Sequence, residues 1–213
     1  MSKTKEKIVI ATIQLFNEHG FANVSLPQIA DKLSISLGNL TYHFPKKEQL
    51  INAIYVYFQE ELAAITNNYD YATALEITEI DRRLRAFYAF QQRFHFFYLD
   101  LLELERAYPK LAIKHQKHIE EQIEGIYKSF QYNVSAGNLI ASHSENIYRN
   151  LAQQFWLCTV FWPLQMAVRG KDSSVEAMTT ATWLLVSPYA TEKGKKQLEI
   201  LSQNKNNKSK EVL

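Results

Sequence analysis

The most informative stretch of the sequence is residues 25–51, SLPQIADKLSISLGNLTYHFPKKEQLI. Ser25 followed three residues later by Gln28 fits a capping box, in which side chains bond the free N–H groups at a helix N-terminus. Pro27 suits the first turn of such a helix, where a missing backbone N–H has no consequence. We expect this helix to run to about Leu33.

A second short helix follows after a turn at Ser34–Ile35. Ser36 has the chemistry of an N-cap residue, and Pro45 disfavours helical geometry at Phe44, so the helix ends at His43. Two short helices joined by a turn of about three residues form the helix-turn-helix arrangement. In that arrangement the second helix lies in the major groove of DNA while the first crosses the phosphate backbone. The stretch therefore predicts a DNA-binding module.

On both sides of this module the apolar residues recur at the spacing of an α-helix. One stripe of the preceding helix consists of Ile8, Ala11, Leu15, Phe16 and His19. Gly20 supplies the left-handed stop that commonly ends a helix. One face of the following helix consists of Leu50, Ile51, Ile54, Tyr55, Phe58, Leu62 and Ile65. That helix opens near Lys46, and we expect it to stop before the polar pair Asn67–Asn68.

The remaining sequence predicts longer helical segments separated by Pro or Gly chemistry. They lie near residues 76–106, 110–133, 144–169 and 173–188, and the first allows a division in two. Pro163 should kink the third segment, because proline removes a backbone donor from the helix interior. The last residues, SQNKNNKSKEVL, are polar and low in complexity, which is typical of a frayed tail.

These patterns predict an all-α protein of three parts. Residues 1–50 form an N-terminal three-helix domain that contains the helix-turn-helix. Residues 51–190 form a larger C-terminal helical domain for ligand binding and dimerisation, and residues 191–213 form a polar, flexible tail. The hydrophobic fraction of 46% is ample for a core.

Composition indicates where the protein works. The single cysteine, Cys158, makes no internal disulfide, which agrees with a reducing cytoplasm. The polar, lysine-bearing start is unlike a signal peptide, and no run of about 18 apolar residues is present, so we expect no membrane span. The formal net charge of +2 permits nucleic-acid binding without demonstrating it. We expect a cytoplasmic protein.

The second short helix and the residues after it carry groups suited to DNA. Hydroxyl, amide, phenol and imidazole groups that bond phosphates or base edges come from Ser36, Asn39, Thr41, Tyr42 and His43. Gly38 leaves room for a close backbone approach, and Leu37 is placed to meet a thymine methyl group. Lys46 and Lys47 stand at the N-terminus of the next helix, where charge and free N–H groups both favour phosphate.

Residues from about Lys5 to Ile54 resemble the DNA-binding domain of the TetR family of one-component regulators. The matching pattern is a helix ending in HGF, then IA-x-x-L, S-x-G-x-L-x-Y-H-F and K-x-x-L, over about a quarter of the chain. The resemblance implies that Lys47 clamps a phosphate and that Ser25 caps its helix close to the DNA backbone. It also implies operator contacts from Asn39, Thr41, Tyr42 and His43.

Two positions depart from the family pattern. Thr41 stands where the family commonly has a second aromatic side chain before Tyr42, so we expect one phosphate or sugar contact to be weaker or replaced. Pro27 stands where many relatives have a polar side chain that reaches DNA. We therefore expect little base readout from the first helix of the module.

Aromatic side chains crowd two of the longer segments, and two interpretations stay open. One set is Phe87, Tyr88, Phe90, Phe94, Phe96, Phe97 and Tyr98, and the other is Phe155, Trp156, Phe161 and Trp162. The simpler interpretation is core plus dimer interface. The alternative, implied by the family resemblance, is an apolar cavity for a small effector with a few converging polar groups. Its candidate lining is Phe94, Phe97, Trp156 and Phe161, with Arg93, His95, Gln92 and Gln154 as the polar groups.

The last two predicted segments have apolar stripes suited to pairing with their copies in a homodimer. The stripe residues are Leu151, Phe155, Val160, Met178, Trp183 and Leu184. A two-fold dimer matches a palindromic operator, because its two recognition helices then meet successive turns on one face of the DNA.

The sequence contains no recognisable catalytic or cofactor motif, so we expect neither an enzyme nor a bound cofactor. His115, His118 and Glu121 lie near one helix face and are conceivable metal ligands. The nearby Lys114 and Lys117 favour a solvated surface instead, and we expect no metal.

Together these features predict a sequence-specific, homodimeric transcriptional regulator that binds double-stranded operator DNA. As the resemblance implies, we expect a repressor that leaves a palindromic operator when an unidentified small apolar or aromatic effector binds the larger domain. The alternative is a DNA-binding protein without such an effector, either a nucleoid or division factor or a repressor regulated by a protein partner on its aromatic surface.

Overall fold

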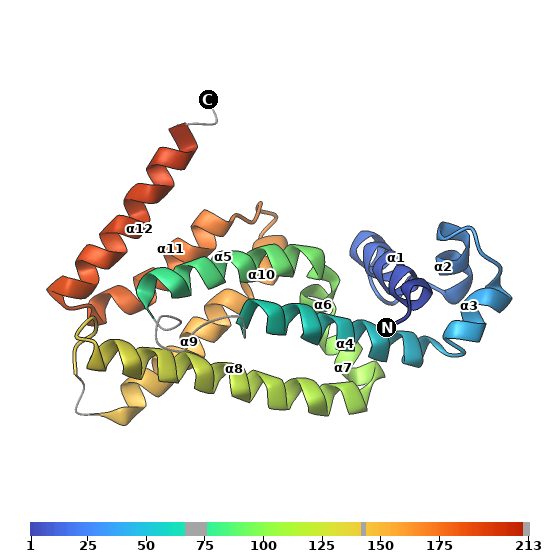
Figure 1. Cartoon of the computed structure of the whole chain (residues 1–213), viewed down its shortest axis with the longest axis horizontal. Helices are drawn as coiled ribbons and strands as arrows, with labels where there is room; N and C mark the ends of the chain where they lie inside the picture. The colour runs from blue at the N-terminus through green and yellow to red at the C-terminus, as the bar shows by residue number, and fades with distance from the viewer. Residues whose placement is uncertain (67–75, 142–143, 211–213) are drawn as a thin grey trace. The chain divides into compact units, whose positions relative to one another are not determined.

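The computed structural model describes residues 1–66, 76–141 and 144–210, and within these ranges the chain is helical with no β-strand (Figure 1). The prediction of an all-α fold is confirmed. None of the described helices combines the length and the apolar composition needed to cross a membrane. The helices are α1 (Lys3–His19), α2 (Leu26–Lys32), α3 (Leu37–His43), α4 (Lys47–Thr66), α5 (Ile77–Arg93), α6 (His95–Leu99), α7 (Leu101–Ala107), α8 (Pro109–Ser135), α9 (Glu145–Val160), α10 (Trp162–Val168), α11 (Val175–Val186) and α12 (Glu192–Lys210), with a 3₁₀ turn at Ser187–Tyr189.

The chain divides into two compact units. The first consists of Met1–Ala64 and Ala89–Gln116, and the second of Ile65–Tyr88 and Lys117–Leu213. The domain boundary predicted at residue 50 differs, because residues 89–116 pack with the N-terminal helices. Phe96 lies edge-on to Phe16 with ring centroids 5.2 Å apart, and Asp100 Oδ2 accepts a hydrogen bond from the Phe21 N–H at 2.9 Å. Such long-range contacts leave no trace in local periodicity.

The helix ends predicted around the helix-turn-helix are present. The Ser25 N–H and hydroxyl both donate to Gln28 Oε1 at 2.7 Å, and Ser36 Oγ accepts from the Asn39 N–H at 3.1 Å. Gly20 ends α1 with a φ of +78°, in the region that glycine adopts without strain. The local sequence therefore determines where these helices begin and end.

The turn between α2 and α3 holds Ser34 at a φ of +54°, a left-handed conformation that the sequence did not signal with glycine. The Ser34 N–H donates to the Asp31 carbonyl, and the Ile35 N–H donates to the Ala30 carbonyl, both at 3.0 Å. These bonds close α2 tightly, so that α3 starts directly afterwards and ends at His43 as predicted.

The apolar stripes predicted for α1 and α4 form much of the core of the first unit. His19 is the exception: it occupies the last turn of α1, and its imidazole stays exposed beside Glu18, 3.7 Å away. Ile65 is half-buried, and α4 ends at Thr66, while the predicted stop at Asn67–Asn68 lies outside the described residues. The buried stripe residues are Ile8, Ala11, Leu15, Phe16, Leu50, Ile51, Ile54, Tyr55, Phe58 and Leu62.

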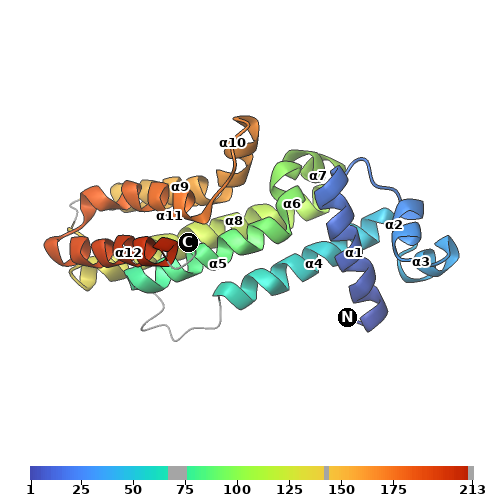
Figure 2. The ribbon, with the colours of Figure 1, turned by 90° about the horizontal axis from the view of Figure 1, so that it is seen from above.

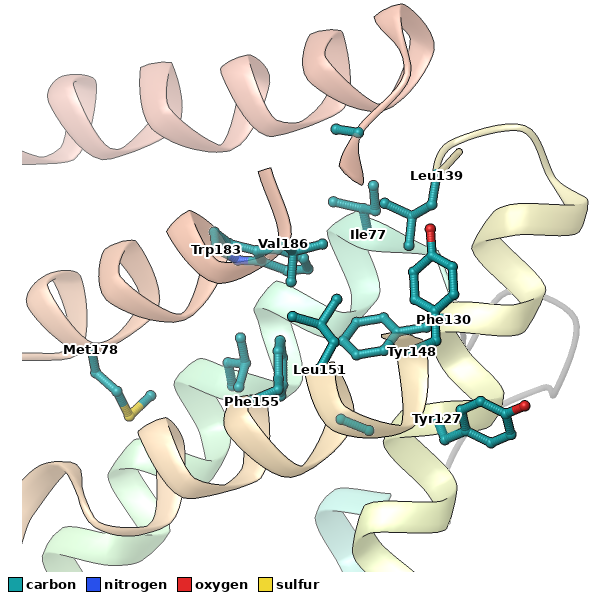
Figure 3. Close-up of a cluster of buried hydrophobic side chains, with 13 residues drawn as sticks. Ile77, Tyr127, Phe130, Leu139, Tyr148, Leu151, Phe155, Met178, Trp183 and Val186 are labelled. Atoms are coloured by element: carbon teal, nitrogen blue, oxygen red, sulfur yellow. The ribbon is translucent and has the colours of Figure 1, made fainter. Parts of the chain in front are cut away.

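In the second unit α9 and α11 run side by side, as both ribbon views show (Figures 1 and 2). Side chains from α5, α8, α9 and α11 converge on one core cluster (Figure 3). The Trp183 indole N–H donates to Asp81 Oδ1 at 2.7 Å, and Asp81 Oδ2 lies 2.8 Å from Arg85 Nε. Both oxygens of this buried carboxylate are therefore bonded, which avoids the cost of an unpaired buried charge. The cluster consists of Ile77, Leu84, Tyr127, Phe130, Leu139, Tyr148, Leu151, Ala152, Phe155, Met178, Trp183, Val186 and Ala190.

The later helices differ from the prediction in continuity. The predicted segment 76–106 is three helices, α5 to α7, with breaks at Phe94 and Asp100. Pro163 lies in the first turn of α10, so the predicted kink is a complete break after α9.

The tail predicted to be flexible from residue 191 begins instead as α12. Leu198 and Leu201 of this helix pack against the core cluster, and Gly194 lies so close to the Asn138 carbonyl that an added Cβ would meet its oxygen at 2.1 Å. Apolar residues therefore anchor the start of α12 despite its polar composition. The last three residues, 211–213, lie outside the described residues.

Candidate nucleic-acid interface

Helix α3 presents a polar face to solvent and an apolar side chain to the core. Leu40 is fully buried, whereas Tyr42 is 82% exposed, so the phenol is not part of the core of this unit. The exposed residues predicted to contact DNA are Ser36, Leu37, Gly38, Asn39 and Tyr42, and the half-buried ones are Thr41 and His43. The structure therefore brings these predicted side chains together on one short helix and its cap.

The side chains of α3 differ in the contacts that they make within their own helix. Thr41 Oγ1 donates to the carbonyls of Leu37 at 2.9 Å and Gly38 at 3.2 Å. The rings of Tyr42 and His43 meet edge-on with centroids 5.1 Å apart. The Thr41 hydroxyl is thus already bonded within the helix, while the exposed Tyr42 phenol extends into solvent.

Lys46 and Lys47 are adjacent in sequence and differ in environment. Lys46 is exposed before the first turn of α4. Lys47 Nζ donates to the carbonyls of Phe21 at 2.9 Å and Val24 at 2.6 Å, and it lies 4.6 Å from the centroid of the Phe21 ring. Burial lowers the pKa of Lys47, and the Glu103 carboxylate partly opposes that shift. Lys47 therefore joins the α1–α2 connection to α4. The sequence predicted a phosphate contact for Lys47 but not this structural role.

The N-terminus of α2 lies at the surface. Ser25 and Pro27 are exposed, and the Ser25 hydroxyl is bonded to Gln28. Ser25 therefore caps α2 as predicted, while its contact with the DNA backbone stays a prediction.

The side chains predicted to bind an effector divide between the two units. Gln92, Arg93, Phe94, His95 and Phe97 belong to the first unit, and Gln154, Trp156 and Phe161 belong to the second. The sequence could not anticipate this division, since it depends on which helices pack together.

The predicted aromatic lining in the first unit is packed core. Phe94 and Phe97 are 1% and 3% exposed, and their ring centroids lie 5.3 and 4.5 Å from that of Phe58. Tyr98 is buried as well, and this burial raises the pKa of its phenol well above the usual value. The His115 ring meets that of Phe97 edge-on at 5.1 Å. The predicted place of His115 on a solvated surface is therefore wrong, because the neighbouring lysines lie on other sides of α8.

The predicted polar groups in the first unit bond to other helices. Arg93 forms an ion pair with Glu61 of α4, with Nη1 and Oε2 2.7 Å apart, and its Nη2 donates to the Tyr57 hydroxyl at 3.2 Å. His95 Nε2 lies 2.9 Å from the carbonyl oxygen of Asn17 in α1. Both side chains thus link residues 93–95 to the helices that flank the helix-turn-helix.

In the second unit the predicted effector residues lie around a link between α8 and α9. The Trp156 indole N–H donates to Gln122 Oε1 at 2.9 Å, and Gln122 Nε2 lies 3.0 Å from His118 Nε2. The Trp156 and Phe161 rings meet edge-on at 5.8 Å, and Gln154 is exposed. Burial lowers the pKa of His118. Within the described ranges, no group of three or more His, Cys, Asp or Glu side chains is arranged to hold a metal ion.

Most of the stripe predicted as the dimer interface is instead the protomer's own core. Of the predicted set, only Leu184 is exposed, at 64%, and Leu157 of α9 is exposed at 54% although the sequence interpretation missed it. Periodicity identifies an apolar stripe but does not say what covers it. The signal for Leu157 was an apolar residue on the otherwise polar side of an amphipathic helix. The buried residues of the predicted set are Leu151, Phe155, Val160, Met178 and Trp183.

Two family models match the chain in succession. The model described as "Bacterial regulatory proteins, tetR family" matches residues 8–59. The model described as "Bacterial transcriptional repressor" matches residues 57–198. Together they cover both the helix-turn-helix and the larger set of helices.

Curated relatives match the N-terminal region. The HTH-type transcriptional regulator UidR of Escherichia coli K12 is 39% identical over 61 residues, which are 29% of this chain and 31% of UidR. RutR of the same organism is 39% identical over 54 residues, which are 25% of this chain and 26% of RutR. The chain therefore spans less than a third of the length of these relatives.

Solved structures share the fold over almost the full length. A TetR-family regulator from Marinobacter aquaeolei VT8 aligns with a TM-score of 0.84 at 21% identity, over 95% of this chain and 98% of that one. CprB from Streptomyces coelicolor A3(2) aligns with a TM-score of 0.70 at 15% identity, over 94% and 96%. The structural likeness shows the fold, and the family models show the relationship: the chain belongs to the TetR family of bacterial transcriptional regulators.

Proposed function

We propose that this TetR-family regulator is a repressor that binds a palindromic operator as a homodimer. The observation that carries the proposal is the geometry of α3, where buried Leu40 anchors the helix while Asn39 and Tyr42 face solvent. A short helix held by its apolar side, with amide and phenol groups outward, suits insertion into the major groove.

We assign the base contacts to Asn39 and Leu37. The Asn39 amide can bond adenine in a bidentate manner, and the exposed Leu37 side chain suits a thymine methyl group. Phosphate contacts are assigned to Tyr42, His43 and Lys46, because phenol, imidazole and ammonium groups bond phosphate oxygens. Gly38 allows the backbone to approach the DNA closely, while Ser25, Ser36 and Thr41 act mainly within their own helices.

The outward faces of α9 and α11 are the proposed dimer interface. Leu157 and Leu184 are exposed apolar residues on these two adjacent helices, which place large side chains where a second copy would cover them. In a two-fold interface, residue i of one copy contacts residue j of the other and residue j contacts residue i, so one substitution alters the interface twice.

The dimer is tested by Leu184→Glu, with Ile113→Glu as the matched control. Ile113 is 68% exposed and belongs to the other unit, so a glutamate there leaves the proposed interface intact. Sedimentation analysis should show monomers for Leu184→Glu and dimers for Ile113→Glu. Dimers of Leu184→Glu at micromolar concentration would contradict this interface.

We also propose release by a small effector and a cytoplasmic location. A solved relative, SmeT, is described as a complex with triclosan, and its fold aligns with a TM-score of 0.63. In this chain Phe58, Phe94 and Phe97 fill the space between them, so an aromatic effector here would have to replace ring–ring contacts. The same close packing favours the second candidate, a DNA-binding regulator that responds to a protein partner or to no ligand.

The proposed function is tested by selecting bound sequences from random duplex DNA with the purified protein at near-physiological salt. We expect one palindrome with half-sites about one helical turn apart. Salt-sensitive binding without a consensus would overturn the sequence-specific proposal.

A further inference from the structure

Two helix breaks in the first unit have no cause in the local sequence. Between Ile77 and Ala107 there is neither glycine nor proline, yet helix geometry is interrupted at Phe94 and again at Asp100. Phe94 is the N-cap residue of α6, and its ring cannot accept the hydrogen bond that a capping side chain normally accepts. The first break must therefore be stabilised by another part of the chain.

Asn17, near the end of α1, supplies the missing bonds. Its Nδ2 donates to the Arg93 carbonyl at 2.8 Å, and its Oδ1 accepts from the Phe96 N–H at 3.1 Å. In a continuous helix these two groups would instead bond the Phe97 N–H and the Gln92 carbonyl, four residues away. One asparagine side chain thus takes the place of two intrahelical hydrogen bonds, and it acts as the N-cap of a helix from a distant position.

The contacts around Asn17 fasten the break to the helices that flank the helix-turn-helix. The Phe96 ring packs on that of Phe16 in α1, one residue before Asn17. At the second break Asp100 Oδ2 accepts from the Phe21 N–H, directly after α1. Asn17 binds the carbonyl of Arg93, and the guanidinium of Arg93 forms an ion pair with Glu61 of α4.

We propose that Asn17 is a positioning residue for operator binding: by holding the α5–α6 break against the end of α1, it fixes the orientation of the helix-turn-helix. The proposal rests on the proposed DNA-binding function, and it gives Asn17 no contact with DNA. Because α1 packs on α2 and α2 packs on α3, a shift at the end of α1 moves the recognition helix. A dimer binds two half-sites at a fixed spacing. If the orientation of α3 varies, the dimer therefore discriminates less well between operators with different distances between the half-sites.

The test compares Asn17→Ala with Asn23→Ala in the full chain. Asn23 is a matched control, because it is an exposed asparagine in the α1–α2 connection, six residues after Asn17, and among the residues that the structure describes its Nδ2 donates only to the nearby His19 carbonyl. In Asn17→Ala, backbone amides of residues 93–100 should exchange with solvent about tenfold faster, as expected when about 1.4 kcal/mol of local stability is lost. Asn23→Ala should leave these rates unchanged.

Operator binding provides the readout that a merely structural role would not change. On the palindrome recovered by selection, Asn17→Ala should bind about tenfold more weakly with the same salt dependence, because no phosphate contact is lost. Its preference for that palindrome over one with two base pairs inserted between the half-sites should also fall. Asn17→Asp keeps an acceptor for the Phe96 N–H but sets a carboxylate oxygen against the Arg93 carbonyl oxygen, so it should not restore the wild-type affinity.

Unchanged exchange rates at residues 93–100 in Asn17→Ala would show that Asn17 does not hold the α5–α6 break. Unchanged operator affinity and unchanged preference for the half-site spacing, per folded molecule, would overturn the positioning role. If the wild-type protein selects no DNA sequence, the proposed function fails by itself. The exchange rates then still decide whether Asn17 holds the break.

Discussion

Helices α1 to α3 and helices α6 to α7 belong to the same unit, but their ends have different causes. Gly20, the Ser25–Gln28 pair and Ser36 place the ends of the first group at positions that the sequence indicates. The second group is interrupted at Phe94 and Asp100. The side chain of the distant Asn17 holds the backbone at the first break, and at the second the Asp100 carboxylate accepts a hydrogen bond from the distant Phe21 N–H. Local capping thus builds the DNA-binding module, and long-range contacts fasten it to the helices that follow.

This difference has a functional meaning. A module with its own caps keeps its internal shape, so α3 stays a suitable DNA-reading helix whatever happens around it. Each hydrogen bond in either group contributes only about 1 kcal/mol, but those of the second group join segments far apart in the sequence, so a shift of α1 changes them. Regulation of operator binding is therefore expected to act on the orientation of the module rather than on its fold.

The largest expected effect is on the free energy of unfolding, and it comes from the cluster of aromatic rings against which the second group of helices packs. Phe58 is 2% exposed, and its ring lies 4.8 Å from Phe90 and 4.5 Å from Phe97. Phe58→Ala should lower the free energy of unfolding by about 3–5 kcal/mol, because it leaves a cavity among large rings. Val56→Ala on the exposed side of α4 is the control and should change it by less than about 0.5 kcal/mol. Denaturant unfolding measures both, and a loss below about 1 kcal/mol for Phe58→Ala would show that the cluster is not what holds these helices.

The adjacent lysines separate a structural role from DNA contact. Lys47→Ala removes two bonds to carbonyls and should lower the free energy of unfolding by about 1–2 kcal/mol, a value reduced for partial exposure. Lys46→Ala should leave stability unchanged and lower the slope of log affinity against log salt by about one unit.

Thermal unfolding and salt titration of operator binding measure the two effects. The opposite pattern, with a smaller slope and unchanged stability for Lys47→Ala, would show that Lys47 contacts phosphate, as the sequence predicted, and would contradict the structural role assigned from its environment.

The smallest effect tests local capping within the module. Ser36→Ala removes the acceptor for the Asn39 N–H at the start of α3 and should cost about 1 kcal/mol. Because the cap is local, amide exchange should rise in α3 and stay unchanged at residues 93–100. Equal increases in both places, measured by hydrogen exchange, would show that the two groups of helices are not independent in the way proposed.

The same comparison explains how much could be predicted from sequence. Capping residues, Gly20 and Pro45 predicted the helix-turn-helix, and the polar side chains of its second helix predicted the exposed face of α3 that carries Asn39 and Tyr42. These signals lie within a few residues of the structure they determine.

What could not be predicted depends on contacts between distant residues. Nothing near Asn17 in the sequence indicates that it caps α6, and nothing beside Lys47 indicates that its ammonium lies under two carbonyls. The apolar stripe of α9 and α11 was recognised, but only packing shows that Phe155 and Trp183 face the protomer's own core. For this reason the predicted dimer residues were mostly core, and the predicted effector residues divide between two units.

The most direct test of the central claim, that α3 reads the operator, is to repeat the selection from random DNA with Asn39→Ala. The account predicts a recovered palindrome that loses its preference at one symmetric pair of positions, with a loss of about 1–3 kcal/mol at each affected base pair, and keeps its preference elsewhere. An equal loss of affinity on all sequences, with the consensus unchanged, would contradict base reading by Asn39 and the assignment of α3 as the recognition helix.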